Sequence, residues 1–103
     1  MLHWTPATDI DVTSQDFSTL RRYRARVPGV PGEAELIVRR TTGALVAAQT
    51  DVPRSMRDLG VVRALLSRMV ADARSEGLRV VPACPIASDL CRQTPEWWDV
   101  ATL

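Results

Sequence analysis

Apolar and polar residues alternate in two consecutive segments, residues 20–27 and 33–40, and a third β-like run follows at residues 44–52, before Pro53. Successive side chains of a strand point to opposite faces, so the period of two predicts strands at the first two segments, with residues 20–27 half-exposed, and the third run is also predicted to be a strand. Residues 28–32 hold two Pro-Gly pairs and residues 41–43 end in glycine, both of which are typical of turns. The three strands are therefore predicted to form a sequential antiparallel meander.

A helical period follows the third strand. Apolar residues recur at intervals of three and four over residues 56–76, which predicts a long amphipathic helix. Ser55 is suited to be its N-cap. Gly77 is placed where a glycine commonly ends a helix.

The remaining elements are shorter. Residues 78–81 predict a fully buried strand, and a second helix is predicted to begin near Pro85 and to stop before Pro95. The strand-helix-strand order makes the last strand parallel to the third. The predicted fold class is α/β (α+β), with an antiparallel β meander followed by a long helix, a parallel-paired strand and a short helix.

The two ends of the chain carry most of its few aromatic residues. Residues 1–18 show little periodicity and are expected to form a loop or arm that packs onto one domain spanning residues 1–103, with Trp4 and Phe17 as anchors. Trp97 and Trp98 are expected to close the core. Because the two are adjacent, only one of them is expected to be fully buried, and the other offers a contact surface, such as that of a homodimer.

Composition excludes several classes of protein. The hydrophobic fraction of 46% and the charged fraction of 24% are those of an ordinary globular protein. A formal net charge of +1 gives no overall attraction to nucleic acid or to an anionic membrane. Arg22, Arg24 and Arg26, with Arg21, form a basic stripe suited to RNA or a phosphate. A solvated strand face is the favoured alternative, because no aromatic residues for stacking interleave on that face.

The cysteines and the histidine bear on compartment and metal binding. Cys84 and Cys91 lie too far apart on one helix for a disulfide, and free thiols fit a reducing compartment. The first residues lack a basic start followed by an apolar run, and no stretch reaches the length of a membrane span. We therefore expect a cytoplasmic protein. His3 is the only histidine and no C-x-x-C occurs, so no metal site is expected.

Residues 50–66 combine a strand end, an arginine-bearing loop and the start of the long helix. The first turn of a helix has unpaired N–H groups and a positive dipole end, which suit an anion. Gly60 lets a ligand approach the backbone closely. The residues alone leave open whether this is a phosphate site or a structural helix start.

Three blocks of sequence resemble the compact acetyltransferase-like branch of the GCN5-related N-acetyltransferase superfamily. Residues 49–53 (QTDVP) are similar to its H-T-x-V-P strand end, and residues 57–62 (RDLGVV) to its R-G-x-G-[IV]-[GA] loop. Residues 77–85 (GLRVVPACP), followed by 94–97 (TPEW), are similar to its G-L-x-V-x-P-x-C ending with H-P-E-Y. The blocks keep the order of the family over residues 33–100.

This resemblance implies an acyl-CoA-dependent N-acetyltransferase, with acetyl-CoA as a substrate and an amine of a small molecule or protein as the acceptor. By the resemblance, the strand ending at Val52 pairs with the pantetheine arm and the amides of residues 59–63 hold the pyrophosphate. The implied cofactor-binding residues are Asp51, Val52, Arg57, Asp58, Leu59, Gly60, Val61, Val62 and Arg63.

Several positions depart from the family pattern. Asp58 replaces the first loop glycine, and Val62 replaces the second glycine or alanine. The ring-bearing residues of the family that could move a proton fall at Gln49, Leu90 and Thr94 here. The alternative to an enzyme is therefore a non-catalytic module that keeps the fold and binds CoA or a protein partner.

Cys84 is the remaining candidate for a catalytic residue. It precedes the second predicted helix, whose positive end favours a thiolate. The sequence leaves open whether Cys84 is an acyl-accepting nucleophile or a small buried side chain, which is the commoner role of a free cysteine. Cys91, inside the helix, is expected to belong to the core.

Overall fold

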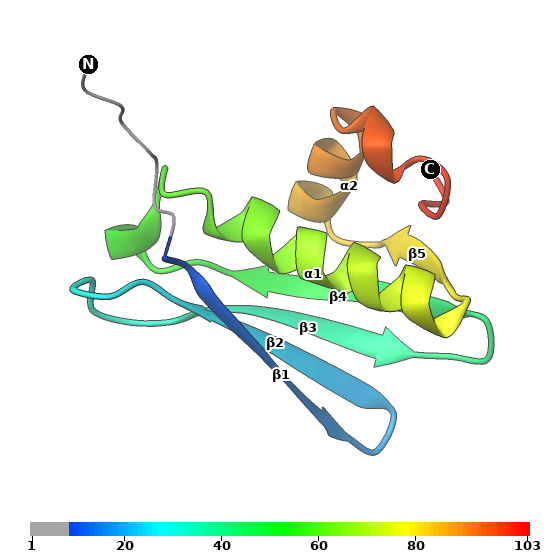
Figure 1. The fold of residues 1–103 in the computed structure, drawn as a ribbon, viewed down its shortest axis with the longest axis horizontal. Helices are drawn as coiled ribbons and strands as arrows, with labels where there is room; N and C mark the ends of the chain where they lie inside the picture. The colour runs from blue at the N-terminus through cyan, green and yellow to red at the C-terminus, as the bar shows by residue number, and fades with distance from the viewer. Residues whose placement is uncertain (1–8) are drawn as a thin grey trace.

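The structure is a computed structural model that describes residues 9–103; His3 and Trp4 lie outside the described residues. It contains one five-stranded sheet with helices packed on it (Figure 1). In chain order the elements are β1 (Asp11–Phe17), β2 (Leu20–Arg26), β3 (Ala34–Arg40), β4 (Ala44–Asp51), the 3₁₀ turn η1 (Arg54–Met56), α1 (Val61–Glu76), β5 (Arg79–Pro82), α2 (Pro85–Arg92) and the 3₁₀ turn η2 (Pro95–Trp97).

The sheet has the order β1-β2-β3-β4-β5, with antiparallel pairing as far as β4 and parallel pairing between β4 and β5. Figure 1 shows α1 along one face of the sheet, with α2 beside it near β4 and β5. The predicted fold class is confirmed, including the crossover that makes β5 parallel to β4. No helix among residues 9–103 has the length and apolar character needed to cross a membrane.

The core lies between the sheet and α1. On β2 and β3 the predicted alternation is confirmed: Tyr23 and Leu36 are fully buried, whereas Arg22 and Glu35 lie on the opposite face. The helix buries one apolar stripe against these strands, and each fully buried leucine contributes roughly 1.5–3 kcal/mol relative to an exposed one. The buried residues of α1 are Val61, Leu65, Leu66, Met69, Val70 and Ala73.

The expectation of an irregular arm over residues 1–18 is wrong for β1. Residues 11–17 form an edge strand whose register pairs Asp11 with Arg26 and Phe17 with Leu20. This strand has no apolar alternation: only Val12 packs against the core, and Asp16 belongs to a polar cluster instead. Phe17 is 40% exposed and does not anchor the core; the Arg22 guanidinium lies over its ring, 5.3 Å from the centroid.

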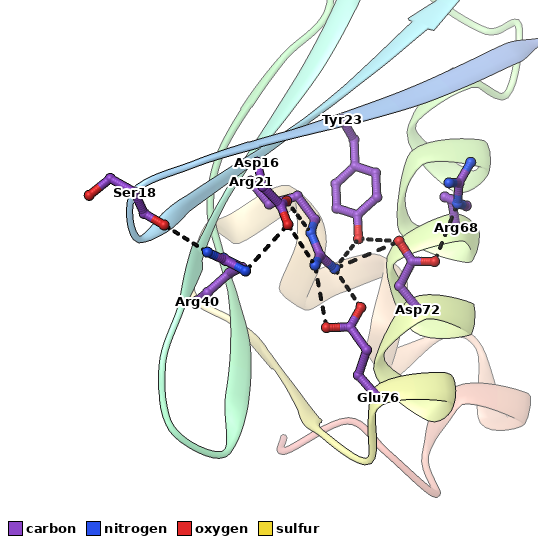
Figure 2. A network of polar contacts seen from close by, with 8 residues as sticks. All are labelled: Asp16, Ser18, Arg21, Tyr23, Arg40, Arg68, Asp72 and Glu76. Atoms are coloured by element: carbon purple, nitrogen blue, oxygen red, sulfur yellow. Dashed lines mark hydrogen bonds and ion pairs between the residues drawn. The ribbon is translucent and has the colours of Figure 1, made fainter.

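That polar cluster ties the first hairpin to α1 (Figure 2). Arg21 donates to Asp16 at 2.7 Å and to Glu76 at 2.8 Å, and the hydroxyl of Tyr23 donates to Asp72 at 2.7 Å. The hydrogen bond from Arg21 lowers the pKa of Asp16, and burial raises the pKa of Tyr23. The sequence analysis placed Arg21 in the basic stripe, and this prediction is wrong. Arg21 faces α1 instead.

The other arginines of the stripe lie on the open face of the sheet. Arg22 and Arg24 each approach Glu35 at 3.9 Å, and Arg26 approaches Glu33 at 3.5 Å. The stripe is thus a mixed-charge face, and Phe17 does supply one aromatic ring on it.

The long helix begins five residues later than its apolar period suggested, at Val61 rather than at about Met56. Between η1 and α1, Asp58 and Gly60 adopt positive φ angles of 65° and 80°, which interrupt a right-handed helix. Ser55 is not the N-cap, because its hydroxyl donates to the carbonyl of Pro31 at 2.7 Å.

The predicted end of this helix is confirmed. Gly77, with φ 70°, is the C-cap and donates to the carbonyls of Ala73 and Arg74. The following strand, β5, was predicted to be fully buried, and this prediction is wrong. Only Val80 is completely inaccessible, because the helices cover one face of β5 while the other stays open.

The end of the chain completes the fold. As predicted, α2 starts at Pro85 and ends before Pro95. Trp97 is buried and Trp98 is 49% exposed, which confirms that only one of the pair is enclosed. The chain then runs along the outer edge of β5, where Val80 bridges to Ala101.

Candidate functional site

β4 contains a β-bulge and, in its last residues, an edge that β5 does not cover. Residues Val38 and Ile37 of β3 pair with Ala47 and Gln49, so Ala48 has no partner in the register. β5 pairs with β4 only as far as Ala47, whose carbonyl accepts hydrogen bonds from the amides of residues 83 and 84, each at 3.0 Å. β5 ends at Pro82, opposite Ala47, so the remaining residues of β4 have no partner from β5.

An open pocket of about 620 Å³ lies beside this unpaired end of β4, between it, the loop before α1, the first turn of α1 and one side of α2. Its volume falls in the range typical of small-molecule sites. The pocket is lined by Thr50, Asp51, Val52, Met56, Arg57, Asp58, Gly60, Val61, Val62, Arg63, Ile86 and Leu90.

The pocket contains every predicted cofactor-binding residue except Leu59. Leu59 is partly buried and packs against the core instead. Thr50, Met56 and Ile86 also line the pocket and were not predicted from the sequence, and Leu90 was noted only as a position where the family has an aromatic ring. The spacing of Ile86 and Leu90, which puts both on one face of a helix, was the available signal for the α2 wall.

The loop before α1 has the backbone shape that glycines favour. Asp58 holds a φ of 65°, a left-handed conformation that is costly for most residues and that aspartate tolerates better than most. Gly60, the N-cap, has a φ of 80°, and a side chain placed there would meet no heavy atom within 4 Å. The space over the start of the helix is therefore open to a ligand.

The helix start presents unused hydrogen-bond donors to this space. The first α-helical hydrogen bond runs from the amide of Ala64 to the carbonyl of Gly60, at 3.1 Å. The amides of Val61, Val62 and Arg63 precede it, so they have no carbonyl one turn earlier in the helix. Together with the helix dipole they form an anion-binding end.

Four charged side chains line the pocket, and their charges balance. Arg57 and Arg63 are basic, and Asp51 and Asp58 are acidic. An anion on the amides of α1 is therefore favoured by the arginines and opposed by the aspartates. The half-buried side chain of Val62 adds bulk at the same helix start.

Cys84 adjoins the pocket through Thr50. The cysteine is the N-cap of α2, is 8% exposed and does not line the pocket. Its sulfur lies 3.2 Å from the hydroxyl oxygen of Thr50, which does line it. Cys91 is fully buried inside α2, and burial, followed by the charge of Cys84, raises the pKa of its thiol. Both cysteines are free thiols.

At three positions the family carries a ring-bearing residue and this chain does not, and the three have different surroundings. Leu90 lines the pocket and gives it an apolar wall. Gln49 is exposed on β4, outside the pocket lining. Thr94 is buried, and its hydroxyl donates to the carbonyl of Leu90 at 2.7 Å while accepting from the guanidinium of Arg63 at 3.4 Å.

The pocket thus offers donors for an anionic group at the amides of α1, unpaired backbone at the end of β4 and apolar side chains from α2. A protein-family model described as GCN5-related N-acetyl-transferase matches residues 22–100, a range that includes the whole pocket lining. No curated protein matches the chain in a sequence comparison.

Proposed function

Because the chain belongs to the GCN5-related N-acetyltransferase family, we propose that it transfers an acetyl group from acetyl-CoA to an amine of a small molecule or protein. The observation that supports this most directly is the pocket at the unpaired end of β4. The residues of two motif blocks, at the end of β4 and in the loop before α1, line this one pocket.

In this proposal the pyrophosphate of the donor lies on the amides of Val61, Val62 and Arg63, near the side chain of Arg57. The pantetheine arm runs along the end of β4, where no strand from β5 competes for the backbone groups of Thr50 and Asp51. Both placements use donors and acceptors that have no partner within the helix or between β4 and β5.

The chemical step needs a neutral amine next to the thioester. Its nitrogen attacks the carbonyl carbon, the carbon–sulfur bond breaks, and CoA leaves as a thiolate that takes up a proton. The amine nitrogen loses a proton in the same sequence. Donors aimed at the carbonyl oxygen and a route for these protons are what the protein has to supply.

Besides the carboxylates of Asp51 and Asp58, two neutral groups at the pocket can carry a proton. The hydroxyl of Thr50 and the thiol of Cys84 form one connected pair at 3.2 Å, whereas Leu90 offers no polar atom. We propose that this pair, together with water, serves the departing thiolate. Cys84 is accordingly our candidate for a catalytic residue.

A second candidate function, a non-catalytic module that binds CoA or a protein partner, is favoured by the charges and shape of the phosphate end. Asp51 and Asp58 place two carboxylates in the pocket, and Val62 occupies the position where the family has glycine or alanine. These features weaken anion binding without changing the fold.

We also place the protein in the cytoplasm. Two buried free thiols fit a reducing compartment, since free cysteines in an oxidising one tend to pair.

The proposed function is tested in two steps. Saturating acetyl-CoA, at 100 times its dissociation constant, should stabilise the fold by about 2.7 kcal/mol, measured as a thermal shift. CoA release in the presence of a panel of amines then distinguishes an enzyme from a binding module. Absence of a shift at millimolar acetyl-CoA would remove the cofactor and the enzyme together, whereas a shift without CoA release supports the non-catalytic module.

A further inference from the structure

Arg63 is held in place by two neutral, buried partners. Its Nη2 donates to the hydroxyl oxygen of Thr94 at 3.4 Å, and its guanidinium carbon lies 5.6 Å from the centroid of the Trp97 ring. Thr94 is 1% exposed and Trp97 is 6% exposed, so both supports are fixed by the core. Because the hydroxyl of Thr94 gives its proton to the carbonyl of Leu90, its oxygen is left to accept from Arg63.

The charge of Arg63 is not neutralised by these partners. Arg21, Arg68 and Arg74 all form ion pairs with carboxylates. Among residues 9–103, no ion pair includes Arg63. A guanidinium that is stacked on an aromatic ring and held at one nitrogen keeps its other N–H groups for a ligand. Arg63 is therefore an oriented cation in the wall of the pocket.

The side chain and the backbone amide of Arg63 point to different parts of the structure. Its amide belongs to the first turn of α1 and points out of the helix end. Its side chain reaches instead to η2, where Thr94 and Trp97 lie. A phosphate bound by the amides of the helix end and an anion bound by the guanidinium would thus be separate groups of one ligand.

We propose that the guanidinium of Arg63 recognises the 3′-phosphate on the ribose of CoA and is a specificity-determining residue. This inference rests on the proposed function, in which the pyrophosphate occupies the amides of α1. CoA carries one further phosphate, and the planar fork of arginine matches phosphate oxygens. Thr94 and Trp97 act as positioning residues, because they hold the guanidinium in advance of binding.

The test compares binding of CoA with binding of dephospho-CoA, which lacks only the 3′-phosphate. We expect the parent protein to prefer CoA by about tenfold, or ~1.4 kcal/mol. Arg63→Gln should lose most of this preference. It should bind CoA more weakly than the parent does, while its affinity for dephospho-CoA stays within about twofold of the parent value. Arg54→Gln, an exposed arginine outside the pocket lining, is the matched control and should keep the preference.

Arg63→Lys and Thr94→Val extend the test to the geometry. Lysine keeps the charge but not the planar fork, so part of the preference should remain. Thr94→Val keeps the arginine at position 63 but removes the hydroxyl that helps to hold its guanidinium, which should reduce the preference without abolishing it. Thermal unfolding of each variant establishes that it folds, and if Arg63→Gln does not fold, Arg63→Lys carries the comparison.

Other outcomes overturn the inference. If Arg63→Gln weakened the binding of CoA and of dephospho-CoA equally, Arg63 would act on the pyrophosphate or only support the pocket. A retained preference for CoA in Arg63→Gln would exclude any role for its side chain. A parent protein that binds both ligands equally removes this inference alone, whereas a parent that binds neither removes the proposed function as well.

Discussion

The hydroxyl oxygen of Thr50 lies 3.2 Å from the sulfur of Cys84, which links the end of β4 to the start of α2 across the candidate site. Thr50 lines the pocket and Cys84 does not, so the thiol adjoins the pocket through the hydroxyl. Either atom can be the donor of this contact. A thiolate at Cys84 would accept from the hydroxyl, whereas a thiol can donate to it.

The first prediction concerns Cys84→Ala. If the thiol handles the proton or the acyl group, the variant should bind acetyl-CoA within about twofold of the parent. Its rate of acetyl transfer should fall by about tenfold or more, since general acid–base catalysis typically contributes about 10²–10⁴-fold. The measurement is CoA release with the best amine acceptor. Cys91→Ala, which changes a thiol buried inside α2, is the control for loss of a cysteine from the core.

Mass spectrometry of the parent after incubation with acetyl-CoA adds a second test. The chain has no lysine, so a stable acetyl adduct must lie on a cysteine, another nucleophile or the amino terminus. Full transfer activity in Cys84→Ala would instead show that the cysteine is structural and that water carries the proton.

Val62→Gly should bind acetyl-CoA more tightly while folding less stably. The half-buried valine lines the pocket beside the amides of α1, and its removal gives a phosphate more room. A glycine inside a helix costs up to about 1 kcal/mol relative to alanine, which should appear in the free energy of unfolding. Calorimetric titration measures the affinity, and Val62→Ala is the control that shortens the side chain with a smaller cost. Equal or weaker affinity in the glycine variant would mean that Val62 does not face the phosphates.

Asp58→Gly should raise both stability and anion affinity, since it relieves a left-handed residue with φ 65° and removes a carboxylate from the pocket. Asp58→Asn separates the two effects, because asparagine tolerates this conformation and has no charge. It should bind acetyl-CoA more tightly, with little change in the free energy of unfolding. Asp58→Ala should be less stable than Asp58→Gly by about 1 kcal/mol. Unchanged affinity in Asp58→Asn would show that the carboxylate points away from the bound anion.

Stability should fall at alkaline pH because of Tyr23. Burial, followed by the hydrogen bond to Asp72, raises the pKa of its phenol above the ordinary value of 10.0. Below that pH both folded and unfolded chains keep the proton. Above it, the unfolded chain ionises while the folded chain does not, so the free energy of unfolding decreases as the pH rises toward the folded pKa.

This effect is measurable because Tyr23 is the only tyrosine and the chain has no lysine. Phenolate absorbance should appear together with unfolding and not before it. Tyr23→Phe should flatten the alkaline loss of stability, apart from the part caused by the buried Cys91, whose pKa is also raised. An ionisation of Tyr23 near its ordinary pKa in the folded protein would contradict the prediction.

Some features of the fold follow from local sequence. The alternation in β2 and β3 and the apolar stripe of α1 repeat over enough residues to identify each element and its buried face. Gly77 marks the end of α1 because a left-handed backbone is needed at that one position. The resemblance to the family placed most of the pocket residues at the end of β4 and the start of α1, because its motifs lie in short segments where neighbours in sequence are also neighbours in space.

The sequence does not locate the start of α1 or identify β1. The helical period extends back to Met56, but the left-handed residues Asp58 and Gly60 interrupt the helix, so it begins at Val61. The strand β1 packs only one apolar side chain against the core, so the period that reports burial is absent from it. What makes β1 a strand is its pairing with β2 and the ion pair of Asp16 with Arg21.

The sequence by itself determined the class of fold, the order of β2 to α2 and the family to which the chain is similar, because each rests on periodicity or on motifs within short segments. The tertiary structure alone decided which distant side chains meet: Thr50 with Cys84, Arg63 with Thr94 and Trp97, and Arg21 with Glu76. These contacts join residues 31 or more positions apart in the chain. Side-chain periodicity reports only which face of an element is buried, and the partner across that face is set by how the elements pack.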